Sequence, residues 1–294
     1  MSTQFKIYVV TYQGHKRINK TLASILASDI KNYLYKVYVI NNHSDIRMAD
    51  AYTGKTGDIH HPNIKVLHNV LRPDWSSGHL SRNWNQALVN GFKSLTNPDC
   101  EYVVCSQDDS IFRPDWAAKL IELHKKYTFV QNGLGDQFHS YMPEAVRNVG
   151  IWDERYCGLS HQAADYFWRC VMYNKAKSSI QDPGHRRVLN PIFPNDVPKS
   201  VGWLVDPDVR QLDGIWDNNL HNNAALAAKL IQHKFGKTAE PHGVFPWTPE
   251  RLANAPKKTQ CMNYITYPYF EKDIYDLEGK NYLCPKPGDW GFKS

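Results

Sequence analysis

Apolar runs alternate with amphipathic stretches along the first 130 residues of the chain. Four runs rich in β-branched and aromatic residues predict strands, at residues 5–12, 36–40, 63–70 and 101–106. Three stretches between and after them carry apolar side chains at helical spacing and predict helices, at residues 18–28, 78–95 and 114–127. Pro114 opens the last of these helices, since proline fits the first helical turn.

The apolar positions within the predicted strands are continuous rather than alternating, which is typical of a mostly parallel sheet covered by helices on both faces. We therefore expect an α/β fold, in which ligands bind beyond the carboxyl ends of the strands. Further helices are predicted at 161–177 and 218–235, and the chain after Pro241 is rich in Pro, Tyr and Trp. This pattern favours one domain, residues 1–240, with a C-terminal tail, residues 241–294, that packs on it or forms a lid.

Composition narrows the class of protein. The 294 residues include 42% hydrophobic and 22% charged residues, as in ordinary folded domains. No apolar run is long enough for a membrane span and the first residues do not resemble a signal peptide, so we expect a cytoplasmic protein. The six cysteines show no CxxC spacing, which argues against a zinc knuckle or a disulfide framework. The net charge of +6 is dispersed and suits a small anionic substrate rather than nucleic acid.

Two adjacent acids, Asp108 and Asp109, follow the predicted strand at 101–106. Neighbouring carboxylates repel each other unless water or a cation separates them. A helix-capping role is weak, because Pro114 begins the helix about five residues later and Asp115 already supplies an acid to its first turn. The pair therefore indicates a site for a cation, or for a metal and a diphosphate, and the alternative is an exposed turn with solvated acids.

Several segments in order along the chain resemble the family-2 inverting glycosyltransferases with the GT-A fold. They are VVTYQ (9–13), INNHS (40–44), GHLSRNWNQA (78–87), QDDSIFRPDW (107–116), VGIWDERYCGL (149–159) and AADYFWR (163–169). Together they cover about residues 5–175. The specificity of the resemblance lies in the ordered set of segments.

The resemblance implies a GT-A, Rossmann-like fold and a glycosyltransferase activity. Such an enzyme moves a hexosyl or pentosyl group from a nucleotide-diphosphate donor, here a UDP-sugar by preference, to a hydroxyl of a glycan or glycoconjugate. The leaving diphosphate develops negative charge, which Mn²⁺ or Mg²⁺ neutralises. These ions accept carboxylate, phosphate and water oxygens, so one or two protein acids suffice.

The resemblance also assigns roles in donor binding. Asn42 aligns with the family's base-contacting Asp, and its amide can accept from the N3–H of uracil and donate to a carbonyl. Thr11 is expected to contact the nucleotide, and Asp108 the ribose. Arg82 aligns with a helix position near the diphosphate, where a guanidinium adds positive charge. A surface salt bridge is the alternative for Arg82.

Metal binding is assigned to Asp109 and, late in the chain, to His242. His221 is the second choice for the histidine ligand. Gln107 occupies the first position of the family's acidic triplet, so the acidic cluster is reduced to two carboxylates. A missing acid weakens the expected metal binding, and a variant that depends less on metal is conceivable.

The catalytic base departs from the family pattern. The family carries a Glu-Asp pair where this chain has Gln162 and Ala163. We expect Asp165 to be the base that takes the proton of the acceptor hydroxyl, with His161 next. The alternative for Asp165 is structural, because Arg169 lies at the helical i,i+4 spacing for an ion pair.

Aromatic residues and two competing functions complete the expectations. Trp75, Trp152 and Trp247 lie near expected strand ends and are candidate walls of a sugar site. A sugar nucleotidyltransferase is one alternative, but VVTYQGHKR (9–17) has a single glycine and is a poor phosphate loop. A non-catalytic carbohydrate-binding descendant of the fold is the other, and the missing Glu-Asp pair favours it.

Overall fold

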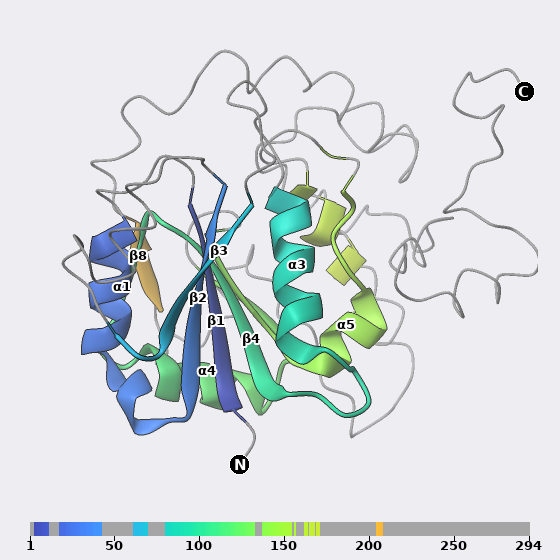
Figure 1. Cartoon of the computed structure of the whole chain (residues 1–294). Helices are drawn as coiled ribbons and strands as arrows, with labels where there is room; N and C mark the ends of the chain where they lie inside the picture. The colour runs from blue at the N-terminus through green and yellow to red at the C-terminus, as the bar shows by residue number, and fades with distance from the viewer. Residues whose placement is uncertain are drawn as a thin grey trace, which may run out of the picture.

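The structure is a computed structural model, and it describes residues 3–11, 18–42, 61–69, 80–132, 137–154, 156, 162–163, 165–167, 169–170 and 204–207 (Figure 1). The predicted helix at 218–235 and the predicted tail at 241–294 lie outside the described residues, so the division into domain and tail stays a prediction. Within the described part of the chain, none of the helices combines the length and apolar character that a membrane span requires.

A six-stranded sheet forms the centre of the molecule, in the order β3-β2-β1-β4-β7-β6. Its strands are β1 (Thr3–Thr11), β2 (Tyr35–Asn41), β3 (Ile64–His68), β4 (Cys100–Gln107), β6 (Phe129–Asn132) and β7 (Phe138–Tyr141). The pairs β1–β2, β1–β4 and β2–β3 are parallel, whereas β7 is antiparallel to both β4 and β6. The predicted mostly parallel α/β sheet is confirmed, and β7 is the strand that runs against the others.

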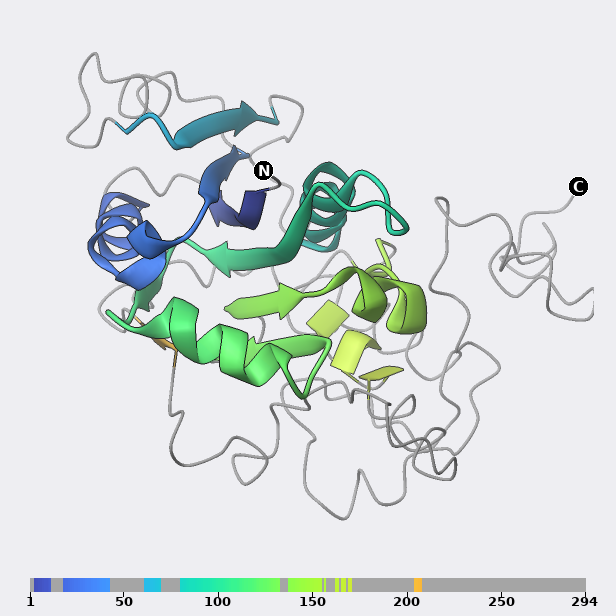
Figure 2. The same ribbon diagram turned by 90° about the horizontal axis from the view of Figure 1, so that it is seen from below.

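Helices cover both faces of this sheet (Figures 1 and 2). They are α1 (Ile18–Ala27), α3 (Leu80–Phe92), α4 (Trp116–His124) and α5 (Pro143–Val149), with a short 3-10 helix η1 (Asp29–Asn32) after α1. One core cluster joins β1 to α1 and α4, and the other joins β1 to α3 and α5. Alternate residues of a strand point to opposite faces. Phe5, Ile7 and Val9 accordingly enter the first cluster, while Tyr8 and Val10 enter the second.

Helix α3 approaches β4 closely, at Gly91 near its end. A β-carbon added to Gly91 would overlap Cγ2 of Val103 and lie 3.4 Å from Cγ1, so only a glycine allows this separation of helix and strand. The buried ammonium of Lys6 on β1 donates to the carbonyl oxygen of Gly91 over 2.8 Å. This bond satisfies a carbonyl near the helix C-terminus, where intrahelical partners run out.

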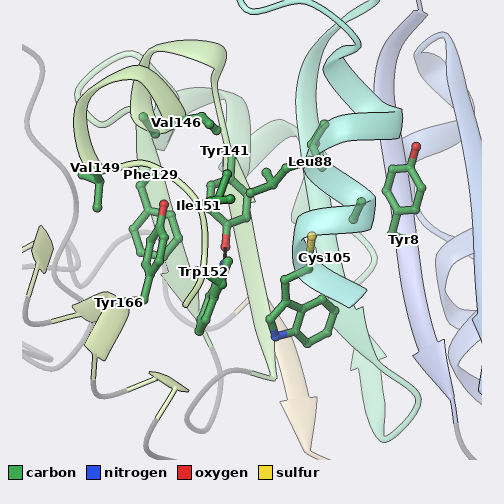
Figure 3. Packing of buried hydrophobic residues seen from close by; sticks show 14 of the residues in the cluster. Tyr8, Leu88, Cys105, Phe129, Tyr141, Val146, Val149, Ile151, Trp152 and Tyr166 are labelled. Atoms are coloured by element: carbon green, nitrogen blue, oxygen red, sulfur yellow. Dashed lines mark hydrogen bonds between the residues drawn. The ribbon is translucent and has the colours of Figure 1, made fainter. Parts of the chain in front are cut away.

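The core next to α3 and α5 is largely aromatic (Figure 3). Trp152 is 1% exposed, stacks on Tyr166 with ring centroids 4.5 Å apart, and donates its indole N–H to the hydroxyl of Tyr141 over 2.8 Å. The expectation that Trp152 forms a wall of a sugar site is therefore wrong, because its ring is buried in the core. Trp75 and Trp247 lie outside the described residues.

A second, two-stranded sheet holds the segment that follows the acidic pair. It consists of β5 (Ser110–Phe112) and β8 (Val205–Pro207), which are antiparallel. Arg113 binds both carboxylate oxygens of Asp206, with Nε–Oδ2 and Nη2–Oδ1 distances of 2.9 and 2.7 Å. The backbone N–H of Arg113 also donates to the carbonyl oxygen of Leu204. A late part of the chain thus fixes the path of the chain just beyond Asp109.

Candidate functional site

The predicted donor-binding residues meet at the carboxyl edge of the parallel strands, the upper edge of the sheet in Figure 1. Thr11 ends β1, Asn42 follows β2, and Asp108 follows β4. The strands are in register there, because Thr11 pairs with Asn41 and Val10 pairs with Gln107. The backbone N–H of Asn42 donates to the carbonyl oxygen of Thr11 over 3.0 Å. Three residues far apart in the sequence therefore lie on three adjacent strand ends.

Asp108 is the buried member of the acidic pair, with an exposed fraction of 8%. The hydroxyl of Thr11 donates to its carboxylate, and the hydroxyl of Thr21 on α1 donates to its backbone carbonyl oxygen over 2.8 Å. Hydrogen bonds to a carboxylate favour its charged form and offset the loss of water. Asp108 is thus fixed by β1 and α1, and the Thr11 hydroxyl, which we expected at the nucleotide, is directed to Asp108.

Asp109 is half-buried and occupies the next position of the turn between β4 and β5. Gln137 holds this turn: its side-chain N–H groups donate to the backbone oxygen of Asp109 over 3.0 Å and to Oδ1 over 3.3 Å. The carbonyl oxygen of Gln137 accepts from the backbone N–H of Gln107 and from the hydroxyls of Ser106 and Ser110. The two carboxylates therefore have different protein partners, Thr11 for Asp108 and Gln137 for Asp109.

The residues present fit a cation that takes few ligands from the protein. Among the described residues, no three His, Cys, Asp or Glu side chains gather as a ready-made set of metal ligands. The half-buried carboxylate of Asp109 lies at the edge where a donor diphosphate is expected, and Mg²⁺ commonly binds through one or two carboxylates together with phosphate and water oxygens. Asp109 is the described residue that would hold such an ion, while the predicted ligand His242 lies outside the described residues, as does His221.

Asn42 is 3% exposed and hydrogen-bonded through its side-chain oxygen. Its Oδ1 accepts from Nδ2 of Asn69, the residue after β3, over 3.1 Å. Its own Nδ2 is buried and has no hydrogen-bond partner among the described residues. A buried amide N–H without a partner is uncommon in folded proteins and calls for a specific explanation.

Arg82 lies in the first turn of α3 and is largely exposed. Its Nε is 3.4 Å from Oε2 of Glu154, so the surface ion pair that we named as the alternative is present. The other oxygen of Glu154 accepts from Nδ2 of Asn85 over 2.9 Å. The side-chain amide of Asn85 also donates to the backbone oxygen of Trp152 and accepts from its backbone N–H, which fixes residues 152–154 against α3. The guanidinium of Arg82 is thereby kept near the carboxyl edge of the sheet.

Asp165 is fully buried and paired with Arg169. Its Oδ2 accepts from Nε of Arg169 over 2.9 Å, and its Oδ1 accepts from the hydroxyl of Tyr156 over 3.4 Å. The two terminal nitrogens of Arg169 donate to the carbonyl oxygens of Val149 and Ile151. Burial alone would lower the pKa of Arg169, but the charge of Asp165 raises it above its usual value. This geometry favours the structural alternative for Asp165, whereas His161 lies outside the described residues.

Two contributors to this site were missed from the sequence. Gln137 precedes a strand that the apolar pattern did not predict, and no feature of its neighbours points to the β4–β5 turn. Asn69 was detectable in principle, since it closes the predicted strand at 63–70 and strand ends in such sheets bind ligands.

Many solved structures are similar to this chain, and two of them are the following. One is residues 1–349 of TarS from S. aureus in complex with UDP, with 13% identity, a TM-score of 0.41, and coverage of 58% of this chain and 56% of that one. The other is the mannosyltransferase PcManGT from Pyrobaculum calidifontis in complex with GDP-Man and Mn²⁺, with 14% identity, a TM-score of 0.44, and coverage of 79% and 63%. No family model matches the sequence, and no curated protein does.

Proposed function

We propose that the chain is a GT-A glycosyltransferase that transfers a sugar from a nucleotide-diphosphate donor, with UDP-sugars favoured, to a hydroxyl of a glycan or glycoconjugate. The observation that carries the proposal is the meeting of Thr11, Asn42 and the Asp108–Asp109 turn at adjacent carboxyl ends of one sheet. These are the strand ends at which ligands bind in open α/β sheets. The ordered segments that resemble family-2 glycosyltransferases contain the same residues.

Each residue has a role in the proposed donor complex. Asn42 contacts the nucleobase at the end of β2, Asp108 the ribose, and Asp109 holds Mn²⁺ or Mg²⁺ at the diphosphate. Bound there, the ion neutralises the charge that develops on the leaving diphosphate. Arg82 adds a second positive charge on the α3 side, in a position stabilised by Glu154.

Transfer with inversion requires that the acceptor hydroxyl attack the anomeric carbon from the side opposite the diphosphate. As the new C–O bond forms, the hydroxyl proton moves to a base and the bond to the diphosphate breaks. The buried pairing of Asp165 with Arg169 supports a positioning role for Asp165, and His161 is then the proposed base. The same pairing favours one competitor, a carbohydrate-binding protein of this fold that lacks a catalytic base.

Ligand-induced thermal stabilisation tests the donor site. UDP, GDP, UDP-sugars and GDP-sugars are added to the full chain with Mn²⁺ and with EDTA. A donor present at about 100 times its Kd stabilises the folded state by roughly 2.7 kcal/mol, so a rise in Tm that requires Mn²⁺ is expected. The proposal is overturned when none of these nucleotides raises Tm. Slow Mn²⁺-dependent hydrolysis of the stabilising UDP-sugar separates an enzyme from a binding protein, and release of pyrophosphate from UTP and a sugar phosphate identifies a nucleotidyltransferase instead.

A further inference from the structure

A chain of side-chain amides lies beside the carboxyl ends of β2 and β3. Nδ2 of Asn69 is 3.1 Å from Oδ1 of Asn42, 3.3 Å from Oδ1 of Asn83 and 2.9 Å from Oε1 of Gln86. Asn83 and Gln86 lie in the first turns of α3, so the chain connects that helix with the ends of two strands. The backbone N–H of Asn69 donates to the carbonyl oxygen of Asn41 over 2.8 Å, which fixes the position of Asn69.

Asn69 and Gln86 bind each other in both directions. Besides the bond from Asn69 to Oε1 of Gln86, Nε2 of Gln86 donates to Oδ1 of Asn69 over 3.2 Å. An amide has one end that donates and one that accepts, so neither side chain can invert without losing both bonds unless its partner inverts too. Asn42 and Asn83 would have to invert with them, because both present oxygens to Asn69.

This arrangement determines which end of the Asn42 amide is left for a ligand. The acceptor Oδ1 is occupied by Asn69, and the donor Nδ2 is the buried atom without a partner among the described residues. A buried N–H without a partner destabilises the folded protein, and a ligand oxygen that accepts from this N–H removes that destabilisation. The geometry therefore provides a donor, rather than an acceptor, at the end of β2.

We propose that Asn69, held by Gln86, is a specificity-determining residue that makes Asn42 a hydrogen-bond donor to a carbonyl oxygen of the nucleobase. The inference rests on the proposed function, because it assumes that the ligand at this edge is a nucleotide. It goes further because it states that Asn42 donates to the nucleobase rather than accepting from it, and that Asn69 and Gln86 fix this direction. Uracil and guanine carry such carbonyl oxygens, whereas adenine has an amino group in place of the guanine oxygen.

The test exchanges amides for carboxylates that can only accept. In Asn69→Asp, the new carboxylate still accepts from Gln86 but repels Oδ1 of Asn42, so Asn42 turns its NH₂ group inward and its oxygen toward the ligand. The matched control is Asn83→Asp, which adds the same charge to the same network. Oδ1 of Asn83 accepts from Nδ2 of Asn69, and a carboxylate at this position accepts as well, so the pairing of Asn69 with Gln86 and the polarity of Asn42 are unchanged. Asn42→Leu removes the donor to the nucleobase outright, and replaces Asn69→Asp should that variant not fold.

The measurement is the Kd of UDP, GDP and ADP with Mn²⁺, by calorimetry on the full chain. The readout is the affinity of the better of UDP and GDP relative to that of ADP, because general damage to the site weakens all three alike. We expect this ratio to fall about tenfold in Asn69→Asp and in Asn42→Leu, and to stay within about threefold in Asn83→Asp.

Three results would overturn the inference. A ratio unchanged in Asn69→Asp and Asn42→Leu contradicts it while leaving the proposed function standing, since the wild-type protein then still binds the nucleotide. An equal loss in Asn83→Asp shows that added charge, not amide polarity, is responsible. Absence of binding of all three nucleotides to the wild-type chain removes the proposed function and the inference together.

Discussion

The hydroxyl of Thr11 donates a hydrogen bond of 2.5 Å to Oδ2 of Asp108, a residue 97 positions later in the chain. The bond joins the last residue of β1 to the turn after β4, at the centre of the parallel part of the sheet. Asp108 is 8% exposed, so its carboxylate depends on protein donors in place of water. The side chain of Thr11 therefore acts on the candidate site through Asp108.

Thr11→Val removes this donor with little change in shape. We expect a loss of about 1–3 kcal/mol in the free energy of unfolding, because a buried acceptor loses a hydrogen bond. Thr11→Ser keeps the hydroxyl and serves as the control, with a smaller loss. Urea unfolding of the three proteins, together with Mn²⁺-dependent UDP binding, provides the measurement. Equal urea midpoints for Thr11→Val and the wild-type protein would show that the bond contributes nothing.

The parallel half of the fold was predictable because its strands are apolar runs, which are largely buried in β1, β2 and β4. Strands β1, β2, β3 and β4 and helices α1, α3 and α4 lie where the apolar pattern placed them, to within a few residues. Strands β6 and β7 were missed. They contain polar residues that are buried only because tertiary partners satisfy them. Ser140, for example, is hydrogen-bonded to Nε2 of His124 on α4 over 2.8 Å.

The candidate site was predictable in its location but not in its connections. The strand-end rule placed Asn42 and Asp108 at one edge, and register in the sheet brings them there. Which partner each polar group takes depends on side chains from distant segments, such as Gln137 beside Asp109 and Asn69 beside Asn42. The spacing of Asp165 and Arg169 gave the ion pair only as the alternative to a catalytic base, and it gave no sign of the complete burial of the pair.

Gly91→Ala tests the close approach of α3 to β4. The added methyl group overlaps Cγ2 of Val103, and overpacking of this kind costs about 1–3 kcal/mol. Alanine favours a helix over glycine by about 1 kcal/mol. A Gly91→Ala variant more stable than the wild-type protein would therefore show that α3 moves away from β4 at little cost. Val103→Ala supplies the space, and we expect the double variant to be more stable than the sum of the two single effects predicts. Thermal or urea unfolding of the four proteins completes the cycle.

Alkaline pH should destabilise the fold through its buried thiols and phenols. Burial raises the pKa of Cys100 from 9.0 to about 12, and it also raises the pKa of Tyr8. Above pH 9.0 the unfolded thiol loses its proton while the folded one keeps it, so the unfolded state binds fewer protons and stability falls as pH rises. The urea midpoint is expected to begin to fall near pH 9.0 and to go on falling up to about pH 12.

Cys100→Ala isolates the contribution of one thiol to this slope. The variant loses packing at every pH, but its urea midpoint should depend less steeply on pH than that of the wild-type protein. The slope is not abolished, because burial raises the pKa of Cys105 and Cys170 as well. Parallel slopes for the two proteins would contradict the assignment to Cys100.

Asp109→Asn should separate ligand binding from stability. Asp109 is half-buried, and an asparagine oxygen can still accept from Gln137, so we expect the urea midpoint to stay close to that of the wild-type protein. The lost charge should abolish the Mn²⁺-dependent rise in Tm with UDP. Asp115→Asn is the matched control, because Asp115 is an exposed acid that pairs with Lys119 on α4. Retained Mn²⁺-dependent binding in Asp109→Asn would remove the metal site from this turn.

Asp165→Asn distinguishes a structural residue from a catalytic base. The guanidinium of Arg169 is 2% exposed, and removal of its counter-charge leaves a buried charge uncompensated, at a cost of about 3–5 kcal/mol. We therefore expect a large fall in the urea midpoint. The charge-balanced control is the double variant Asp165→Leu with Arg169→Met, which removes both charges and should lose less stability than the single variant, because apolar pairs often replace buried ion pairs at little cost.

The result expected of a catalytic base is different. If Asp165 served only to take the proton from the acceptor hydroxyl, Asp165→Asn would stop sugar transfer and leave the urea midpoint and UDP binding unchanged. The hydrogen bonds from Arg169 to Val149 and Ile151 argue against this outcome, since they depend on a guanidinium that Asp165 holds in place. Transfer lost in proportion to the folded fraction would assign Asp165 to the structure and direct the search for the base to His161.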